Sequence, residues 1–290
     1  MIRILLLLVA FFAAPALAAP VQVASPDGVL SVAVDVNGEG RPEYSVSRLN
    51  RPVILPSRLG FILTDAPKLE RNVEIVSSRR GSVDETWEQP WGERRFVRNR
   101  YNELRVRLTE KAPPKRSLEI VFRVYDDGIG FRYEFPDQPG LEQVNIGEEI
   151  TEFALADPAT AWWIPAFQWN REEYLYNRTR ISEVGIAQTP MTIRTDGGLH
   201  IAFHEAALVD YSGMNLQNEG RGRFRAILTP SSDGAKVRRT APFPTPWRTM
   251  QIADSAGGLV TNNLILNLNE QNRLPDIRTW FKPFKYVGVW

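Results

Sequence analysis

The sequence contains no cysteine and only two histidines among its 290 residues. The absence of cysteine excludes disulfide bridges, thiolate metal sites and cysteine nucleophiles. A multi-histidine metal site or a histidine relay would have to use His200, His204 or both. Composition therefore excludes several large classes of catalytic and metal chemistry.

The sequence also lacks an excess of charge of either sign. Lysine and arginine total 35, and aspartate and glutamate total 34. A dedicated nucleic-acid binder needs a surplus of cationic side chains to displace counterions from the phosphates. The neutral balance therefore predicts that the protein has no nucleic-acid partner.

Long apolar runs are missing except at the start of the chain, where residues 4–14 carry no charge and follow Arg3. A membrane-spanning helix needs about 20 apolar residues, so this run is too short to be one. A single positive residue, a short apolar stretch and an Ala-x-Ala site ending at Ala18 are the pattern of a secretory signal peptide. We therefore predict a signal peptide over residues 1–18, no membrane span, and an exported protein. Export without cysteine favours a bacterial periplasm.

Alternation of apolar and polar residues dominates residues 19–280. Residues 29–36 place aliphatic side chains on one face and Ser31 and Asp35 on the other, which is the period-two pattern of a β-strand. Further strands are predicted at 104–108, 118–124, 129–135, 191–194, 199–203, 224–228 and 259–268. Asp126-Asp127-Gly128 predicts a tight turn between two of them. The predicted fold class is all-β, a large antiparallel β-sandwich.

The last residues of the chain, 286–290, form a predicted apolar strand with no polar residue after them. Domains seldom leave such a strand uncovered, because a large exposed apolar surface normally marks a contact site. We therefore expect the polypeptide to continue beyond residue 290.

His200, His204 and Glu205 are candidates for a metal site. On a strand, residues four apart lie about 13 Å from each other, too far to bind one zinc ion. We therefore expect the two imidazoles to be exposed or hydrogen-bonded. Glu205 stands where the predicted strand ends, and its carboxylate has three possible states: solvated, paired with an arginine, or bound to a hard cation such as Ca²⁺. Composition alone favours the solvated state.

Trp162, Trp163 and Trp169 form an aromatic cluster close to Glu172 and Glu173. Tryptophan is commonly a core residue, but tryptophan beside carboxylates also forms platforms on which sugar rings stack. Both interpretations stay open from the residues alone. The sequence contains no Gly-x-Ser-x-Gly elbow, phosphate-binding loop or dinucleotide fingerprint.

Several segments, taken in order, resemble glycoside hydrolase family 97. The first is the predicted hairpin at 124–136, and the others are 190–193, 204–211, 245–248, 267–270 and 285–290. The resemblance covers essentially the whole chain after the predicted signal peptide. One departure is Phe284, where the family usually has glycine.

This resemblance implies an enzyme of three parts: an N-terminal β-super-sandwich similar to galactose mutarotase, a (β/α)₈ catalytic barrel and a small C-terminal β-domain. The implied activity is calcium-dependent hydrolysis of α-glucosides or α-galactosides in the periplasm. Residues 19–280 would be the sandwich and residues 281–290 the start of the first barrel strand. The two catalytic carboxylates would then lie beyond residue 290, so no catalytic residue is assigned in this chain.

The resemblance also implies candidate site residues. Glu205 is the best positional match for a ligand that the sandwich lends to a Ca²⁺ site shared with the catalytic barrel. Trp163, Trp169 and Asn170 are expected to line the same interface and to contact an α-linked oligosaccharide. Two alternatives stay open: a free-standing carbohydrate-binding sandwich without hydrolase activity, and a structural envelope protein.

Overall fold

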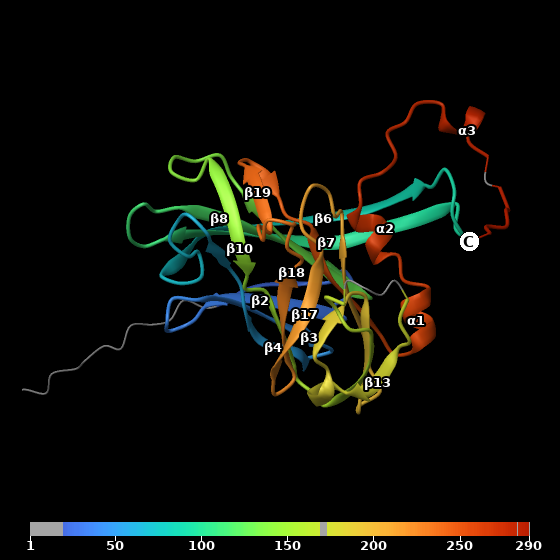
Figure 1. Ribbon diagram of the computed structural model, residues 1–290, viewed down its shortest axis with the longest axis horizontal. Helices are drawn as coiled ribbons and strands as arrows, with labels where there is room; N and C mark the ends of the chain where they lie inside the picture. Colours follow the sequence, from blue (N-terminus) through green and yellow to red (C-terminus); the bar gives the residue numbers. More distant parts are fainter. Residues whose placement is uncertain (1–19, 169–172, 283, 290) are drawn as a thin grey trace, which may run out of the picture.

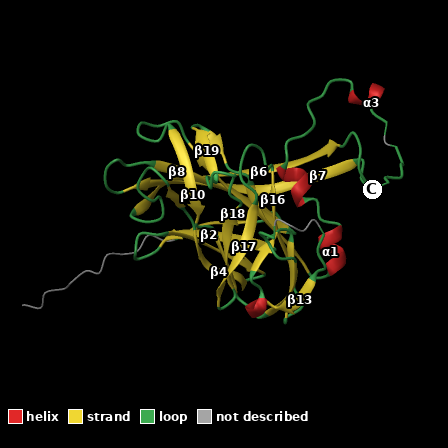
Figure 2. Ribbon diagram, in the orientation of Figure 1, coloured by secondary structure: helices red, strands yellow, loops and turns green. Residues whose placement is uncertain are grey.

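The computed structural model describes residues 20–168, 173–282 and 284–289. Within these residues the strands form three sheets in which every pairing is antiparallel (Figures 1 and 2). The prediction of an all-β fold built from large antiparallel sheets is confirmed. No helix in the described ranges has both the length and the apolar character needed to cross a membrane.

Among the described residues, the first sheet has eight strands. In their order across the sheet they are β1 (Val21–Ala24), β2 (Leu30–Val36), β3 (Pro42–Arg48), β4 (Arg51–Arg58), β11 (Glu152–Leu155), β18 (Arg223–Leu228), β17 (Met214–Gly220) and β14 (Ile186–Gln188).

The second sheet has ten strands in the same described part of the chain. Nine lie side by side in the order β13 (Asn177–Arg180), β12 (Ala159–Trp163), β15 (Met191–Thr195), β16 (His200–Ala206), β21 (Trp247–Ala253), β9 (Gly128–Phe135), β8 (Ser117–Tyr125), β7 (Phe96–Glu110) and β6 (Val73–Glu88). The tenth, β20 (Phe243–Pro244), pairs with the end of β9.

A third, smaller sheet consists of β19 (Val237–Thr240), β10 (Gln143–Glu149) and β5 (Phe61–Leu63). The helical segments in the described residues are short. They are the 3₁₀ helix η1 (Ile181–Glu183) and the α-helices α1 (Ala256–Val260), α2 (Leu264–Leu268) and α3 (Ile277–Trp280).

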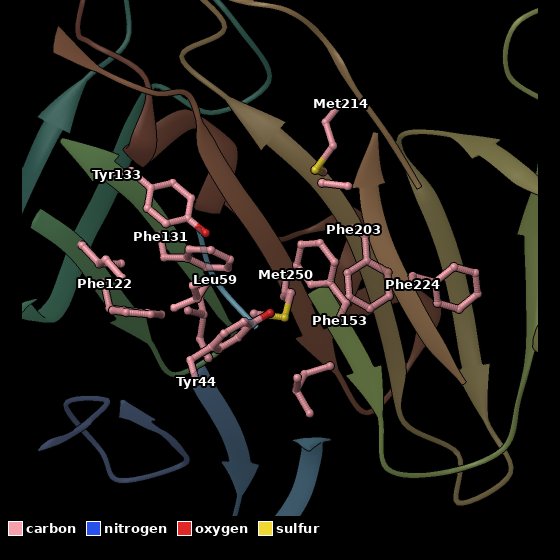
Figure 3. Close-up of a cluster of buried hydrophobic side chains, with 14 of the residues drawn as sticks. Tyr44, Leu59, Phe122, Phe131, Tyr133, Phe153, Phe203, Met214, Phe224 and Met250 are labelled. Carbon is pink, nitrogen blue, oxygen red and sulfur yellow. The ribbon is translucent and has the colours of Figure 1, made fainter. Parts of the chain in front are cut away.

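Aromatic side chains from the two large sheets meet in the core (Figure 3). The ring of Tyr44 on β3 lies 4.9 Å from that of Phe131 on β9, and Phe153 on β11 lies 5.1 Å from Phe203 on β16. The Tyr44 hydroxyl donates to the main-chain oxygen of Glu152 at 2.8 Å, so this buried polar group is satisfied. Period-two patterning produces this core, because each strand turns its apolar face inward.

The strands predicted at 191–194, 199–203 and 224–228 are present as β15, β16 and β18, and Asp126 and Asp127 form the turn between β8 and β9. The strand predicted at 259–268 is wrong, because these residues form parts of α1 and α2. Both edges of β9 already pair with other strands, so this segment packs across the face of the sheet instead of joining it.

Two glycines on β9 make room for α2. A Cβ atom at Gly128 would lie 2.9 Å from Cδ2 of Leu264, and one at Gly130 would lie 2.4 Å from Cδ1 of Leu268. Leu264 and Leu268 are four residues apart and therefore share one face of the helix. Leu264 and Leu268 thus occupy space that side chains at these two glycine positions would fill, and they cluster there with Val121, Tyr125 and Trp247 of the sheet.

The apolar strand predicted at 286–290 is not formed in the described residues 284–289, which have no regular structure. Tyr286 is 89% exposed and Val289 is 95% exposed. A strand needs a neighbour to satisfy its N–H and C=O groups, and none pairs with this segment within the described part of the chain. The assignment of this segment to a barrel strand stays a prediction.

Candidate functional site

Glu205, the residue predicted to bind calcium, lies near the end of β16 and is 8% exposed. Its cross-strand neighbour on β21 is Arg248, whose Nη1 atom lies 2.6 Å from Oε2 of Glu205. The main-chain N–H of Met214 donates to both carboxylate oxygens, at 3.1 and 3.2 Å. Glu205 is therefore buried and paired with an arginine, and the solvated state that composition favoured is wrong.

Arg248 is fully buried and binds a second carboxylate, that of Glu149 at the end of β10. Two parallel hydrogen bonds join them, from Nε to Oε1 at 2.9 Å and from Nη2 to Oε2 at 2.6 Å. We call Glu149, Arg248 and Glu205 the acidic triad. Its members come from the ten-stranded and three-stranded sheets, and Met214 begins a strand of the eight-stranded sheet. The triad and its amide partner therefore connect all three sheets.

Hydroxyl groups complete the surroundings of Glu149. Thr151 donates to its Oε1 atom at 2.7 Å, and the hydroxyl of Tyr133 lies 2.8 Å from that of Thr151. The Tyr211 hydroxyl lies 3.4 Å from Oε2 of Glu149. A buried charge is tolerated only when it is paired and hydrogen-bonded, and Glu149 meets both conditions.

Burial and charge shift the pKa values of two members of the triad, Glu205 and Arg248. Burial raises the pKa of Glu205 above its ordinary value, and the nearby Arg248 only partly offsets this effect. Burial acts on Arg248 by disfavouring its charge, but the charges of Glu149 and Glu205 outweigh it and raise the pKa of Arg248. The guanidinium therefore stays charged inside the core.

These surroundings do not fit a calcium ion at Glu205. Calcium takes six to eight oxygen ligands. The described ranges hold no group of three His, Cys, Asp or Glu side chains placed to bind a metal. The guanidinium of Arg248 also occupies the side of Glu205 where a cation would be attracted. Calcium binding by Glu205 stays a prediction, and it would require further ligands from outside the described residues.

Trp163, predicted to contact substrate, is the last residue of β12 and is 9% exposed. Its indole N–H donates to Oγ1 of Thr179 at 3.1 Å, and its ring belongs to the main core cluster. Trp163 lies two strands away from Glu205 in the ten-stranded sheet. Trp169 and Asn170 lie outside the described residues. A shared substrate site for these residues therefore stays a prediction.

One of the two histidines, His204, matches the expectation that the imidazoles are exposed or hydrogen-bonded. Nδ1 of His204 lies 3.3 Å from Oγ1 of Thr189, and burial lowers the pKa of the imidazole. Nδ1 of His200 is buried without a hydrogen-bond partner in the described structure. Neither histidine is part of a metal cluster in the part of the chain that the structure describes.

Sequence reasoning missed Arg248 and Glu149. A signal for Arg248 was available, because it shares the inward face of its strand with Met250 and Ile252, where a charge requires a buried partner. Glu149 gave no such signal. The register of β10 shifts between Ile146 and Glu148, and this irregularity turns Glu149 toward the core.

Comparison with known proteins identifies the family. A family model described as Glycosyl-hydrolase 97 N-terminal matches residues 23–271. The chain is 24% identical over 303 residues to a retaining alpha-galactosidase of Bacteroides thetaiotaomicron, with 92% of this chain and 44% of that protein covered. It is 28% identical over 258 residues to a probable retaining alpha-galactosidase of Streptomyces bingchenggensis, with 87% and 38% covered.

A solved structure gives the same result. The glycoside hydrolase family 97 enzyme of Pseudoalteromonas sp. strain K8 is 42% identical, with a TM-score of 0.86, and the match covers 89% of this chain and 39% of that one. Structures of that enzyme contain panose or acarbose. The chain thus spans less than half the length of these relatives. With a family match over most of its length, the chain belongs to the glycosyl-hydrolase 97 N-terminal family.

Proposed function

We propose that this chain is the N-terminal domain of an exported α-glycosidase. In this proposal the sandwich supports, and partly lines, an active site that the rest of the polypeptide completes. The observation that carries the proposal is the family match over residues 23–271, combined with coverage of less than half of each relative. A retaining glycosidase needs two carboxylates that flank the scissile bond, and we assign both to the remaining polypeptide.

The proposed substrate is an α-linked oligosaccharide. Two relatives are named as α-galactosidases, which supports an α-galactoside, and a relative bound to panose supports a test with that sugar. We expect the purified full-length protein to hydrolyse an aryl α-galactoside or panose, and residues 19–290 alone to hydrolyse neither. Turnover by the isolated chain would contradict the assigned division of roles. No turnover of either substrate by the full-length protein would contradict the proposed activity.

We also propose that the full-length enzyme depends on Ca²⁺, as the family resemblance implies. Removal of calcium with a chelator is expected to abolish hydrolysis, and added Ca²⁺ to restore it. Glu205→Gln separates two roles for Glu205. Because Arg248 already holds this carboxylate, a lower unfolding temperature with unchanged calcium activation would assign Glu205 to the fold alone. Weaker calcium activation would instead identify Glu205 as a ligand.

Export is the third part of the proposal. The predicted signal peptide, residues 1–18, lies outside the described residues. We expect the mature protein in the periplasm of its natural host to begin at Ala19, which mass spectrometry of its N-terminal peptide measures. Recovery of the intact N-terminus in the cytoplasm would contradict export.

A further inference from the structure

The hairpin formed by β6 and β7 extends beyond the rest of the ten-stranded sheet. The two strands pair along their whole length, whereas β8 pairs with β7 only from Asn102 to Thr109. Residues 83–101 therefore have no backbone pairing with β8, although the Tyr125 hydroxyl at the end of β8 donates to Oδ1 of Asn99 at 3.1 Å. Figure 1 shows this part of the hairpin reaching toward the C-terminal end of the chain. We call residues 83–101 the hairpin arm.

The arm binds the segment after β21 through α2. The indole N–H of Trp87 donates to Oδ1 of Asn267 at 2.9 Å, and the side-chain amide of Asn267 donates to the main-chain oxygen of Arg98 at 2.9 Å. Asn267 is buried, and the arm satisfies the hydrogen-bonding needs of both of its side-chain polar atoms. Both strands of the hairpin, β6 through Trp87 and β7 through Arg98, are thus connected to α2.

The tip of the arm makes a second contact, with α3 and the residue after it. Nη2 of Arg278 lies 2.7 Å from Oε1 of Glu88, and the ring of Phe281 lies 4.7 Å from the ring of Trp91. The same Glu88 oxygen accepts a hydrogen bond from Arg95 at 2.5 Å. One carboxylate therefore joins the arm to the C-terminal segment through two arginines.

Exposed apolar side chains lie on both partners of this second contact. Trp91 is 46% exposed and Phe96 is 58% exposed on the arm, and Trp280 on α3 is 58% exposed. Further exposed apolar side chains follow in the C-terminal segment: Phe284, Tyr286, Val287 and Val289. Exposed apolar groups gathered at one place mark a contact surface, whereas isolated ones need no explanation.

We propose that the hairpin arm is a clasp that holds the segment 270–282 and docks against the polypeptide that follows residue 290. The position of the C-terminal segment favours this occupant, because Arg278 and Phe281, close to the end of the described chain, contact Glu88 and Trp91 of the arm. Relatives of this chain are more than twice as long as the region it matches, so the following polypeptide is large enough to cover the exposed aromatic groups. This inference rests on the proposed function, because it requires the polypeptide that follows residue 290.

A second copy of this chain is the competing occupant, since β6 is an edge strand that could pair with another edge. Charged side chains on edge strands oppose such pairing. The arm portion of β6 carries Asp84, Glu85 and Glu88, and Arg79 and Arg80 precede it. The charge on this edge therefore favours the continuing polypeptide over a strand-to-strand dimer.

The test uses the full-length protein with Trp91→Ser, with Leu49→Ser as the matched control. Leu49 is a similarly exposed apolar residue, at 59%, in the turn between β3 and β4. We expect Trp91→Ser to speed proteolytic cleavage within residues 270–282 about tenfold, because cleavage follows the population of the open segment. We expect Leu49→Ser to leave that rate unchanged. Glu88→Gln, which removes the charge at similar size, is expected to give a smaller increase in the same rate.

Three outcomes would overturn the clasp. One is unchanged cleavage in both Trp91→Ser and Glu88→Gln, and another is equal acceleration in Leu49→Ser. The third is a concentration-dependent dimer, measured by light scattering, that Trp91→Ser dissociates; this would assign the arm to a second copy. Glycosidase activity of the unmodified protein is measured separately, so its absence would contradict the proposed function without affecting the cleavage result.

Discussion

The Nη1 atom of Arg248 lies 2.6 Å from Oε2 of Glu205, and both side chains are buried between the sheets. The reverse arrangement, in which one glutamate is bound by two arginines, is found at Glu152. Glu152 is fully buried and accepts hydrogen bonds from Nε of Arg58 at 2.7 Å and from Nη1 of Arg223 at 2.6 Å. The sandwich therefore holds one arginine between two glutamates and one glutamate between two arginines.

Replacement of Arg248 by methionine is expected to destabilise the protein strongly. The change leaves Glu149 and Glu205 buried without a cation, which costs about 3–5 kcal/mol. Urea unfolding followed by circular dichroism measures the loss. Arg180→Met is the control, because the Arg180–Asp196 pair is exposed, and exposed pairs contribute about 0–1 kcal/mol. Equal unfolding midpoints for the two variants would contradict a structural role for the acidic triad.

The two arrangements predict opposite pH dependences. Burial raises the pKa of Glu205, so the native state holds its proton more tightly than the unfolded state does. Its stabilising contribution is complete below the ordinary glutamate pKa of 4.5 and is lost as pH rises through the raised value. Relative to the non-titrating Glu205→Gln variant, the unmodified protein should therefore lose free energy of unfolding as pH rises above 4.5.

The pKa shift of Glu152, and the pH dependence that follows from it, have the opposite sign. Burial raises its pKa, but hydrogen bonds from Arg58 and the charge of Arg223 outweigh burial and lower the pKa below its ordinary value. The stabilising contribution of Glu152 is present above pH 4.5 and is lost as pH falls through the lowered value. Relative to Glu152→Gln, the unmodified protein should lose stability on acidification. The same sign of change for both variants would show that this account is wrong.

Gly130→Ala is expected to destabilise the packing of α2. The new methyl group would lie 2.4 Å from Cδ1 of Leu268, so the Leu268 side chain or the helix that carries it must shift, at a cost of about 1–3 kcal/mol. Gly81→Ala on β6 is the control, since no atom of the described residues other than its chain neighbours lies within 4 Å of its Cβ position. Thermal unfolding should show a lower midpoint for Gly130→Ala only. A similar decrease in both variants would indicate a general effect of glycine replacement.

Trp163→Leu tests whether this residue serves the core or the substrate. Because the ring is buried and its N–H is bound to Thr179, the truncation is expected to lower stability, by less than the about 3–5 kcal/mol lost when a buried tryptophan is truncated to alanine. Steady-state kinetics of the full-length protein should show an unchanged KM at a temperature where the variant is folded. A raised KM without loss of stability would support the predicted contact with substrate.

The period-two pattern of the sequence was sufficient to predict an all-β sandwich, because alternation reports which side chains face a core. It also predicted the Asp126-Asp127 turn, since that signal is local. The same pattern failed at residues 259–268, where both edges of β9 were already paired and the face of β9 carried glycines. The sequence of residues 259–268 does not indicate that glycines on a distant strand leave room for a helix.

The state of Glu205 was decided only by the tertiary structure. From the sequence, solvation, pairing and cation binding were all open, and the residue's position at a strand end gave no means to choose. Arg248 is its neighbour because β16 pairs with β21, and Glu149 joins them from 99 positions away along the chain. Local pattern therefore determined which residues form strands. Long-range strand pairing and one register shift in β10 determined which charges meet, because such contacts depend on the packing of distant segments.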